Sequence, residues 1–330
     1  MSIIKLKNPA YIFESASAVG CEEHKGPLGD KFDFHDEKDK FGAKTWEMAE
    51  GELGRTALAL ALSKAKLRPE DIDVLFAGDL QNQCVASSGG LYSFKIPYVG
   101  LYGACSTLGE GLMSASLALS ASESLSRVAA VTTSHNCAAE RQFRLPIEYG
   151  GQRPPCAQWT ATAGGAFLLG RDGYAKIERV MPGTIIDGGI ADANNMGAAM
   201  APAAADTIVK YFRESGEHPD DFDAIITGDL AKEGSYLLET ILEKNNIVLK
   251  NHYDCGMMIY DYKKQDVHSG GSGCGCSASV FSAHFLPLLR SGEFKRVLLI
   301  PTGALMSTGS IQQGNNILGI APLICVEGVK

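Results

Sequence analysis

The chain has 330 residues, of which 45% are hydrophobic and 8% aromatic, with 37 glycines and a formal net charge of −8. This length allows two domains or one large two-part fold, and the composition is typical of closely packed α/β proteins. The acidic balance argues against a general nucleic-acid binder, because neutralising phosphates requires clustered Lys and Arg.

The expected elements begin with a strand at residues 11–19 and an exposed loop at 26–40. Thr45 then begins a helix that runs to about Leu67, with apolar residues at helical spacing and Pro69 beyond its end. Residues 72–77 predict the next strand.

Cys105 follows a short apolar segment and precedes a helix of small residues, in the segment Tyr102-Gly-Ala-Cys-Ser-Thr107. A strand–turn–helix junction of this kind places the thiol at the helix N-terminus. There, unpaired N–H groups and the helix dipole favour a thiolate or a bound anion. Cys105 is therefore a nucleophile or the wall of an anion pocket, and a small buried packing residue is the alternative.

The chain also repeats itself. Residues 69–80 match residues 219–230, with six of the twelve positions identical. In addition, 22 residues separate Cys105 from Arg127 and also Cys274 from Arg296, and each cysteine opens a helix that leads to an Arg-Val strand. We interpret this as an internal duplication with halves at 1–175 and 176–330, in which Cys105 and Cys274 face each other near a pseudo-two-fold axis.

Signals for membrane insertion, export and metal binding are weak. No run approaches the roughly 18 apolar residues that span a bilayer, and residues 1–8 lack the apolar region of a signal peptide. The nine cysteines are irregularly spaced, and Cys274-Gly-Cys276 is too tight for the usual Cys-x-x-Cys pattern. We therefore expect reduced thiols, no metal and no cofactor.

The duplicated architecture with a cysteine at its first central helix resembles the thiolase and ketoacyl-acyl-carrier-protein synthase superfamily. Within it, the chain resembles the stage V sporulation protein AD (SpoVAD) family over nearly its whole length. The segments that carry this resemblance are Gly42–Glu50, Ala77–Gln83, Tyr102–Thr107, Glu140–Arg144, Glu148–Pro155 and His268–Cys276. The resemblance implies an α/β, internally duplicated, thiolase-like fold of five layers (α-β-α-β-α) with mixed sheets.

The family resemblance also implies a function. It predicts non-catalytic binding of dipicolinic acid (pyridine-2,6-dicarboxylate), for uptake into the forming spore and release at germination, as a subunit of the SpoVA channel complex. The partners would be the integral membrane subunits of that complex. The protein would be made in the cytoplasm and lie peripherally on the forespore or spore inner membrane. Thiolase-like folds commonly pair, so a homodimer is also expected.

The machinery of a condensing enzyme is incomplete in this sequence. Such enzymes need a base for the thiol and a His/Asn or His/Cys pair for the enolate. Relative to the synthases that the chain resembles, Asp229 stands at a histidine position and Cys274 at the asparagine position, while Met306 and Ser307 replace a thiolase cysteine. We therefore expect no catalysis. The alternatives are an acyl-transfer or condensing enzyme that uses Cys105 on acyl-CoA or acyl-carrier protein, and an assembly subunit with a relic pocket.

Two opposed helix N-termini in a glycine-lined cavity would suit a flat dianion. Arginines of the 136–159 loop add guanidinium groups that can pair with a carboxylate in bidentate fashion, although a solvated loop is the simpler interpretation. We interpret Asp79 and Asp229, at matching positions of the two halves, as structural caps. The predicted ligand-binding residues are Cys105, His268, Cys274, Arg144, Arg153, Ser307, Thr308 and Gly309, with Cys105 as a vestigial nucleophile.

Overall fold

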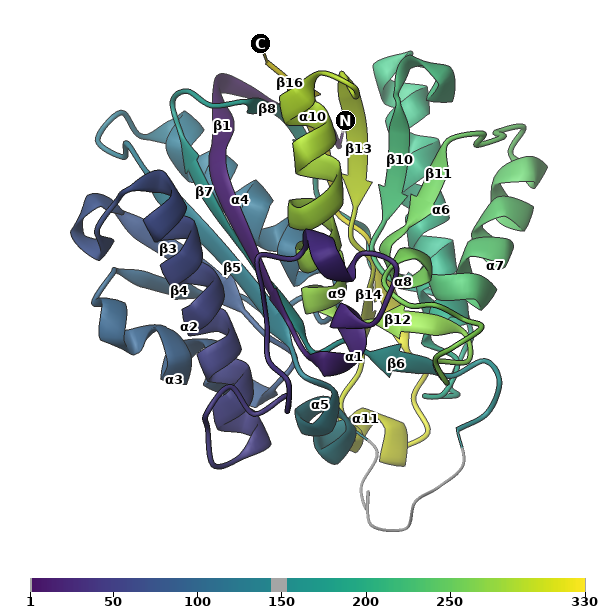
Figure 1. Ribbon diagram of the computed structural model, residues 1–330. Coiled ribbons are helices and arrows are strands. Elements are labelled where there is room, and N and C mark those ends of the chain that lie inside the picture. The colour runs from purple at the N-terminus through teal and green to yellow at the C-terminus, as the bar shows by residue number, and fades with distance from the viewer. Residues whose placement is uncertain (1, 144–152, 330) are drawn as a thin grey trace.

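The computed structural model describes residues 2–143 and 153–329, which form a mixed α/β structure (Figure 1). The strands are β1 (Ile4–Val19), β2 (Phe34–His35), β3 (Val74–Gly78), β4 (Tyr98–Gly100), β5 (Val128–Ser134), β6 (Gln158–Thr160), β7 (Ala163–Gly170), β8 (Ala175–Met181), β9 (Ile186–Asp187), β10 (Ala224–Thr227), β11 (His252–Asp254), β12 (Gly270–Ser272), β13 (Arg296–Ile300), β14 (Gly303–Leu305), β15 (Leu318–Ile320) and β16 (Leu323–Gly328). The α-helices are α1 (Cys21–His24), α2 (Trp46–Ala65), α3 (Val85–Leu91), α4 (Thr107–Ala121), α5 (Asn136–Phe143), α6 (Met196–Ser215), α7 (Ala231–Lys244), α8 (Cys255–Met258), α9 (Cys274–Val280), α10 (Leu286–Ser291) and α11 (Thr308–Gln312).

The main sheet of the described residues has 11 strands, in the order β11-β10-β13-β16-β8-β1-β7-β5-β3-β4, with β2 paired to β1. β1 is its central strand, since it pairs antiparallel with β7 on one side and with β8 on the other. Apart from β2, five strands therefore lie on each side of the junction between β1 and β8. Outward from this junction the order is β1-β7-β5-β3-β4 on one side and β8-β16-β13-β10-β11 on the other. The two sheets expected from the duplication are joined through this junction into one continuous sheet.

Apolar side chains form three core layers between the helices and the sheet. Leu53 and Leu58 of α2 pack on one face of the strands around β5 and β7, and Ile208 of α6 packs on strands β8, β10, β13 and β16. Between them, Leu108 and Leu112 of α4 share a core with α9, α10 and strands from both sides of the junction. Figure 1 shows α2 and α3 outside on the left and α6 and α7 outside on the right. The order helix–strand–helix–strand–helix is that of the thiolase-like fold.

Local chemistry explains where the helices begin and how closely they pack. Thr45 caps α2 by accepting a hydrogen bond from the Met48 N–H (3.2 Å), as predicted. In the centre, a side chain on Gly109 of α4 would lie 2.7 Å from Pro322, and one on Gly275 of α9 would lie 1.8 Å from the Ala163 carbonyl oxygen. Glycine at these positions lets the two central helices approach the strands.

The two similar segments of sequence make the same contacts. Asp73 accepts hydrogen bonds from the N–H groups of Ser126 and Arg127, at 2.7 and 3.0 Å. Asp223 accepts the same pair of bonds from the residues that open β13, at 2.6 and 2.8 Å. Each aspartate thereby ties its strand to the next parallel strand. The division into halves at about residue 175 stays a prediction.

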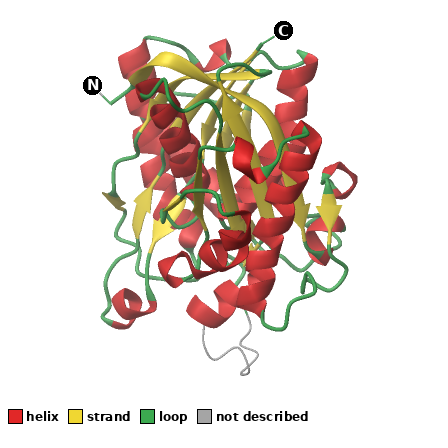
Figure 2. Cartoon of the chain, turned by 90° about the vertical axis from the view of Figure 1, so that its left-hand side faces the viewer, coloured by secondary structure: helices red, strands yellow, loops and turns green. Residues whose placement is uncertain are grey.

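The chain ends and the small elements lie at opposite ends of the sheet. Figure 2 shows the two termini at the same end of the molecule, while α5, α11, β6 and β12 gather at the other end in Figure 1. β6 and β12 pair in parallel, which places Thr160 opposite Ser272. Within residues 2–143 and 153–329, no helix has both the length and the apolar character needed to cross a bilayer.

Candidate functional site

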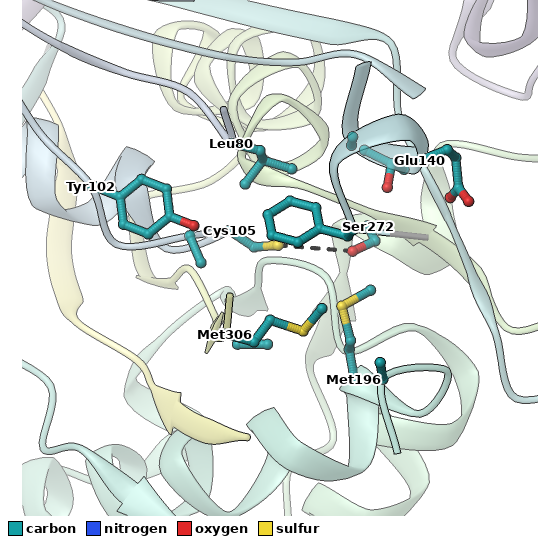
Figure 3. A pocket seen from close by; sticks show the side chains of 13 residues that line it. Leu80, Tyr102, Cys105, Glu140, Met196, Ser272 and Met306 are labelled. Atoms are coloured by element: carbon teal, nitrogen blue, oxygen red, sulfur yellow. Dashed lines mark hydrogen bonds between the residues drawn. The ribbon is translucent and has the colours of Figure 1, made fainter. Parts of the chain in front are cut away.

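A small cavity of about 40 Å³ lies at the start of α4 and contains the Cys105 thiol (Figure 3). The residues that line it come from segments far apart in the sequence, and most of these residues are apolar. The described lining residues are Leu80, Tyr102, Ala104, Cys105, Ala139, Glu140, Phe143, Thr160, Ala193, Met196, Ser272, Ala304 and Met306. Figure 3 shows the sulfur of Cys105 between Tyr102 on one side and Ser272 on the other.

The turn that carries Cys105 is fixed by its own side chains. Ala104 has a left-handed backbone (φ 51°), which is unfavourable for a residue with a Cβ. Ser106 donates its hydroxyl proton to the Gly103 carbonyl oxygen (2.7 Å), and Thr107 donates to the Ala104 carbonyl oxygen (2.7 Å). These bonds hold the strained turn and leave Cys105 only 5% exposed, with its side chain against the cavity.

The buried carboxylate of Asp229 lies behind Ser272. Its Oδ1 accepts a hydrogen bond from the Thr302 hydroxyl (2.7 Å), and its Oδ2 accepts from the Gly273 N–H (2.8 Å) and the Ser272 hydroxyl (3.1 Å). Burial raises the pKa of Asp229 above 3.8, and these donors oppose that rise. Since an ionised carboxylate only accepts hydrogen bonds, three donors aimed at it fit the charged form.

The contacts of the Cys105 thiol favour its protonated form. The Ser272 hydroxyl has one proton and gives it to Asp229, so in the 3.8 Å contact between Cys105 Sγ and Ser272 Oγ the thiol is the donor. Burial, and then the charge of Asp229, raise the pKa of Cys105 well above 9. Cys105 and Ser272 form the floor of the cavity, and the Asp229 carboxylate lies directly behind this floor. The expected thiolate or bound anion at the helix N-terminus stays a prediction.

Cys274 lies close to Cys105 but does not line the cavity. Both side chains belong to one small apolar cluster with Leu80 and Ala139. Cys274 is fully buried, and its thiol donates a hydrogen bond to the Thr133 carbonyl oxygen (2.9 Å). Its contacts are those of a packing residue, and its predicted contact with a ligand stays a prediction.

His268 and Arg153 lie together, but neither is among the residues that line the cavity. The His268 ring contacts the Pro154 carbonyl oxygen and the Asp266 carboxylate, both at 2.9 Å. Arg153 donates to the Asp266 carbonyl oxygen (2.5 Å) and lies over the Trp159 ring at 4.7 Å. Both side chains therefore bind protein groups of the 154–159 and 266–268 segments. Arg144 lies outside the described residues, so its role stays a prediction.

Ser307, Thr308 and Gly309 are exposed and also lie outside the cavity lining. Ser307 caps α11, because its hydroxyl oxygen accepts a hydrogen bond from the Ser310 N–H (3.1 Å). The neighbouring Met306 does line the cavity. Of the eight predicted ligand residues, Cys105 is the one that the described lining contains.

Asp229 and Ser272, beneath and at the floor of the cavity, were not among the residues predicted from the sequence to bind a ligand. Asp229 was interpreted as a structural cap, whereas it contacts the Cys105 site through Ser272. Its position directly after a strand was a usable signal, since sites of α/β proteins gather there. Asp79 does make the expected structural contacts, accepting from the N–H groups of Gln81 (2.8 Å) and Ser87 (2.7 Å).

Across the described parts of the chain, no group of three or more His, Cys, Asp and Glu side chains is arranged to hold a metal ion. The polar groups near Cys105 satisfy one another instead, as the Thr302, Ser272 and Gly273 bonds to Asp229 show. The described site therefore combines one buried thiol, one buried carboxylate and an apolar wall.

Known proteins similar to the chain fall into two groups. The family model described as Stage V sporulation protein AD (SpoVAD) matches residues 2–327. The stage V sporulation protein AD of Bacillus subtilis (strain 168) is 43% identical over 323 residues, covering 97% of this chain and 95% of that protein.

The second group consists of solved structures that share the fold at low sequence identity. The tetronic acid condensing enzyme AbyA1 has a TM-score of 0.61 at 16% identity, over 97% of this chain and 100% of that one. Human mitochondrial 3-ketoacyl-CoA thiolase has a TM-score of 0.59 at 11% identity, over 98% and 100%. The fold is thus thiolase-like, and the chain belongs to the stage V sporulation protein AD family.

Proposed function

We propose that this sporulation protein binds dipicolinate in the Cys105 cavity and does not transform it. The observation that carries the proposal is a cavity walled by aromatic and thioether side chains around a buried thiol, whose pKa is raised by burial and by the charge of Asp229. Flat apolar rings pack well against aromatic and methionine side chains. A thiol is a poor nucleophile until it loses its proton, so this arrangement favours binding over chemistry.

The size of the cavity sets a condition on binding. An apolar cavity that holds benzene has a volume of about 150 Å³, whereas this one has about 40 Å³. A pyridine ring can therefore enter only if lining side chains move. Met196 and Met306 are the candidates, because methionine is unbranched and has three rotatable bonds and both are only partly buried.

We further propose that the protein acts as a subunit of the SpoVA channel complex. Membership of the family supports this role. The protein would hold dipicolinate for uptake into the forming spore and for release at germination. It would reach the spore inner membrane through contacts with integral membrane subunits, and pairing into a homodimer belongs to the same proposal.

Calorimetric titration of the full chain with dipicolinate tests the binding. We expect saturable heat for the native protein and for Cys156→Ser, a control at a cysteine outside the cavity lining. Ala139→Leu fills the cavity from α5, where Ala139 is buried and lines it, and should abolish the heat. Absence of saturable heat with the native protein, at dipicolinate concentrations up to the millimolar range, overturns the proposal.

The alternative function is acyl transfer through Cys105. The position of this thiol directly before α4, in a fold shared with condensing enzymes, is the observation that favours it. Intact-mass analysis after incubation with acetyl-CoA and longer acyl-CoA esters separates the two functions. We expect no acyl adduct, because the thiol is protonated. An adduct on the native protein that is lost in Cys105→Ser would establish the enzyme instead.

A further inference from the structure

Asp229 is a fixed internal anion beneath the cavity. It is fully buried, and it lies where the residues before α4 and α9 approach each other, with Gly273 and Ser272 on the α9 side and Cys105 on the α4 side. This is the place that the sequence suggested for a ligand anion. The donors available there are already directed to a carboxylate of the protein itself.

The protons of the floor groups point away from the cavity as a result. The Ser272 hydroxyl donates to Asp229 Oδ2, and the Cys105 thiol donates toward the Ser272 hydroxyl oxygen. A ligand that reaches the floor therefore meets the lone pairs of an oxygen and a sulfur, with a negative charge directly behind them. The described lining also contains the carboxyl group of Glu140 and no Lys, Arg or His side chain.

Resting on the proposed function, we infer that Asp229 is a specificity-determining residue that excludes anionic groups from the cavity floor, so that dipicolinate enters with its carboxylates outward. The molecule suits this orientation. Its ring nitrogen and two carboxylates share one edge, and the opposite edge carries three C–H groups. The edge of an aromatic ring is its positive part, so the C–H edge is attracted by the thiol and hydroxyl lone pairs. The carboxylates then lie at the mouth of the cavity, away from Asp229.

The orientation predicts which ring position tolerates substitution. Pyridine-2,4,6-tricarboxylate adds a carboxylate to the C–H edge, and in calorimetry with the native protein it should bind at least tenfold more weakly than dipicolinate. In the opposite orientation the added group would point to solvent, so binding within about threefold of dipicolinate overturns the inference. If dipicolinate itself does not bind, this result overturns the proposed function, and with it the inferred orientation. If dipicolinate binds and the tricarboxylate binds equally well, only the orientation is overturned.

The role of Asp229 has its own readout, which requires no bound dipicolinate. Iodoacetamide and iodoacetate are nearly equal in size and differ in charge, and both alkylate a thiolate with loss of iodide. The preference of a thiol is the ratio of its alkylation rate with iodoacetamide to its rate with iodoacetate. We expect this ratio to be at least tenfold larger for Cys105, followed by peptide mass spectrometry, than for glutathione. Asp229→Asn should reduce this preference several-fold and speed both reactions.

Asp79→Asn is the matched control, since Asp79 occupies the equivalent position and its carboxylate accepts hydrogen bonds from the N–H groups of Gln81 and Ser87 rather than from the Ser272 hydroxyl beside Cys105. It should leave the reagent preference at Cys105 unchanged. If Asp229→Asn does not fold, Ser272→Ala replaces it, because this change removes the hydroxyl between the thiol and the carboxylate. Equal reaction of Cys105 with both reagents in the native protein, or an unchanged preference in Asp229→Asn, overturns the inference.

Discussion

Glu23 is a buried carboxyl whose protonation should make the stability of the fold depend on pH. It lies in α1, is only 1% exposed, and accepts hydrogen bonds from the Thr162 N–H (3.0 Å) and from the Tyr260 hydroxyl. Burial raises the pKa of Glu23 from its ordinary value of 4.5 to about 7, and the hydrogen bonds only partly oppose this. The folded state therefore holds this proton more tightly than the unfolded chain does.

The sign and size of the effect follow from linkage. Because the folded pKa is raised, the stabilisation is fully present below pH 4.5 and is lost as the pH rises through about 7. Between pH 5 and pH 8 the loss is about 2.5 kcal/mol. Glu23→Gln removes this titration, so the difference in unfolding free energy between native protein and variant should shift by that amount.

Urea unfolding of both proteins at the two pH values measures the shift. Glu22→Gln is the control for loss of one negative charge, because Glu22 lies in the same short helix, is half exposed and pairs with Lys25. The reasoning is refuted if the difference between native protein and Glu23→Gln is the same at pH 5 and pH 8.

Three further substitutions test other contacts by urea or thermal unfolding. Thr302→Val removes a hydroxyl donor from the buried Asp229 carboxylate and should lower the unfolding free energy by about 2 kcal/mol. Burial alone would raise the pKa of Glu217, but hydrogen bonds from Arg179 and Arg296 lower it to about 2. Glu217→Gln should therefore lower the unfolding free energy at pH 7, and the difference from the native protein should shrink as the pH falls toward 2. Thr45→Ala removes the cap of α2 and should cost about 1 kcal/mol.

Each of these predictions has an outcome that contradicts it. Native stability in Thr302→Val would mean that Asp229 does not need this donor. A Glu217→Gln difference that stays constant from pH 7 to pH 3 would show that its ion pairs contribute nothing to folding. For the α2 cap, Thr45→Ser is the matched control, because serine keeps the hydroxyl; equal losses in both variants would assign the effect to the threonine methyl group.

The fold was predictable where the signals are local. Thr45 begins α2 as expected, and the equal spacing from Cys105 and Cys274 to their following strands placed β5 and β13. The junction of the two sides was not predictable. β1 extends back to Ile4 and pairs there with Val180, and no pattern within a short window reveals a partner so distant in sequence. The continuous sheet is the consequence.

The candidate site was predictable only at its centre. Cys105 could be identified because a cysteine between a strand and a helix is a local feature. Arg153 is predicted as a guanidinium that could pair with a carboxylate, and His268 because it lies near the Cys274 turn in the sequence. In the structure His268 contacts the Asp266 carboxylate, two positions earlier in the chain, and Arg153 donates to the Asp266 carbonyl oxygen. Residue type suggests which chemistry is possible, whereas burial and neighbours decide which partner a charge takes.

Asp79 and Asp229 show this limit most directly, since both stand in a Gly-Asp-Leu segment after a strand. Asp79 accepts from N–H groups two and eight positions further on, which makes it a local cap that a sequence can predict. The side chain of Asp229 accepts from groups 43, 44 and 73 positions further on, which only the folded chain brings to it. The same turn therefore yields a cap on one side of the molecule and, on the other, a fixed charge beside Cys105. That charge raises the pKa of the Cys105 thiol and draws the proton of the Ser272 hydroxyl toward Asp229, away from the cavity.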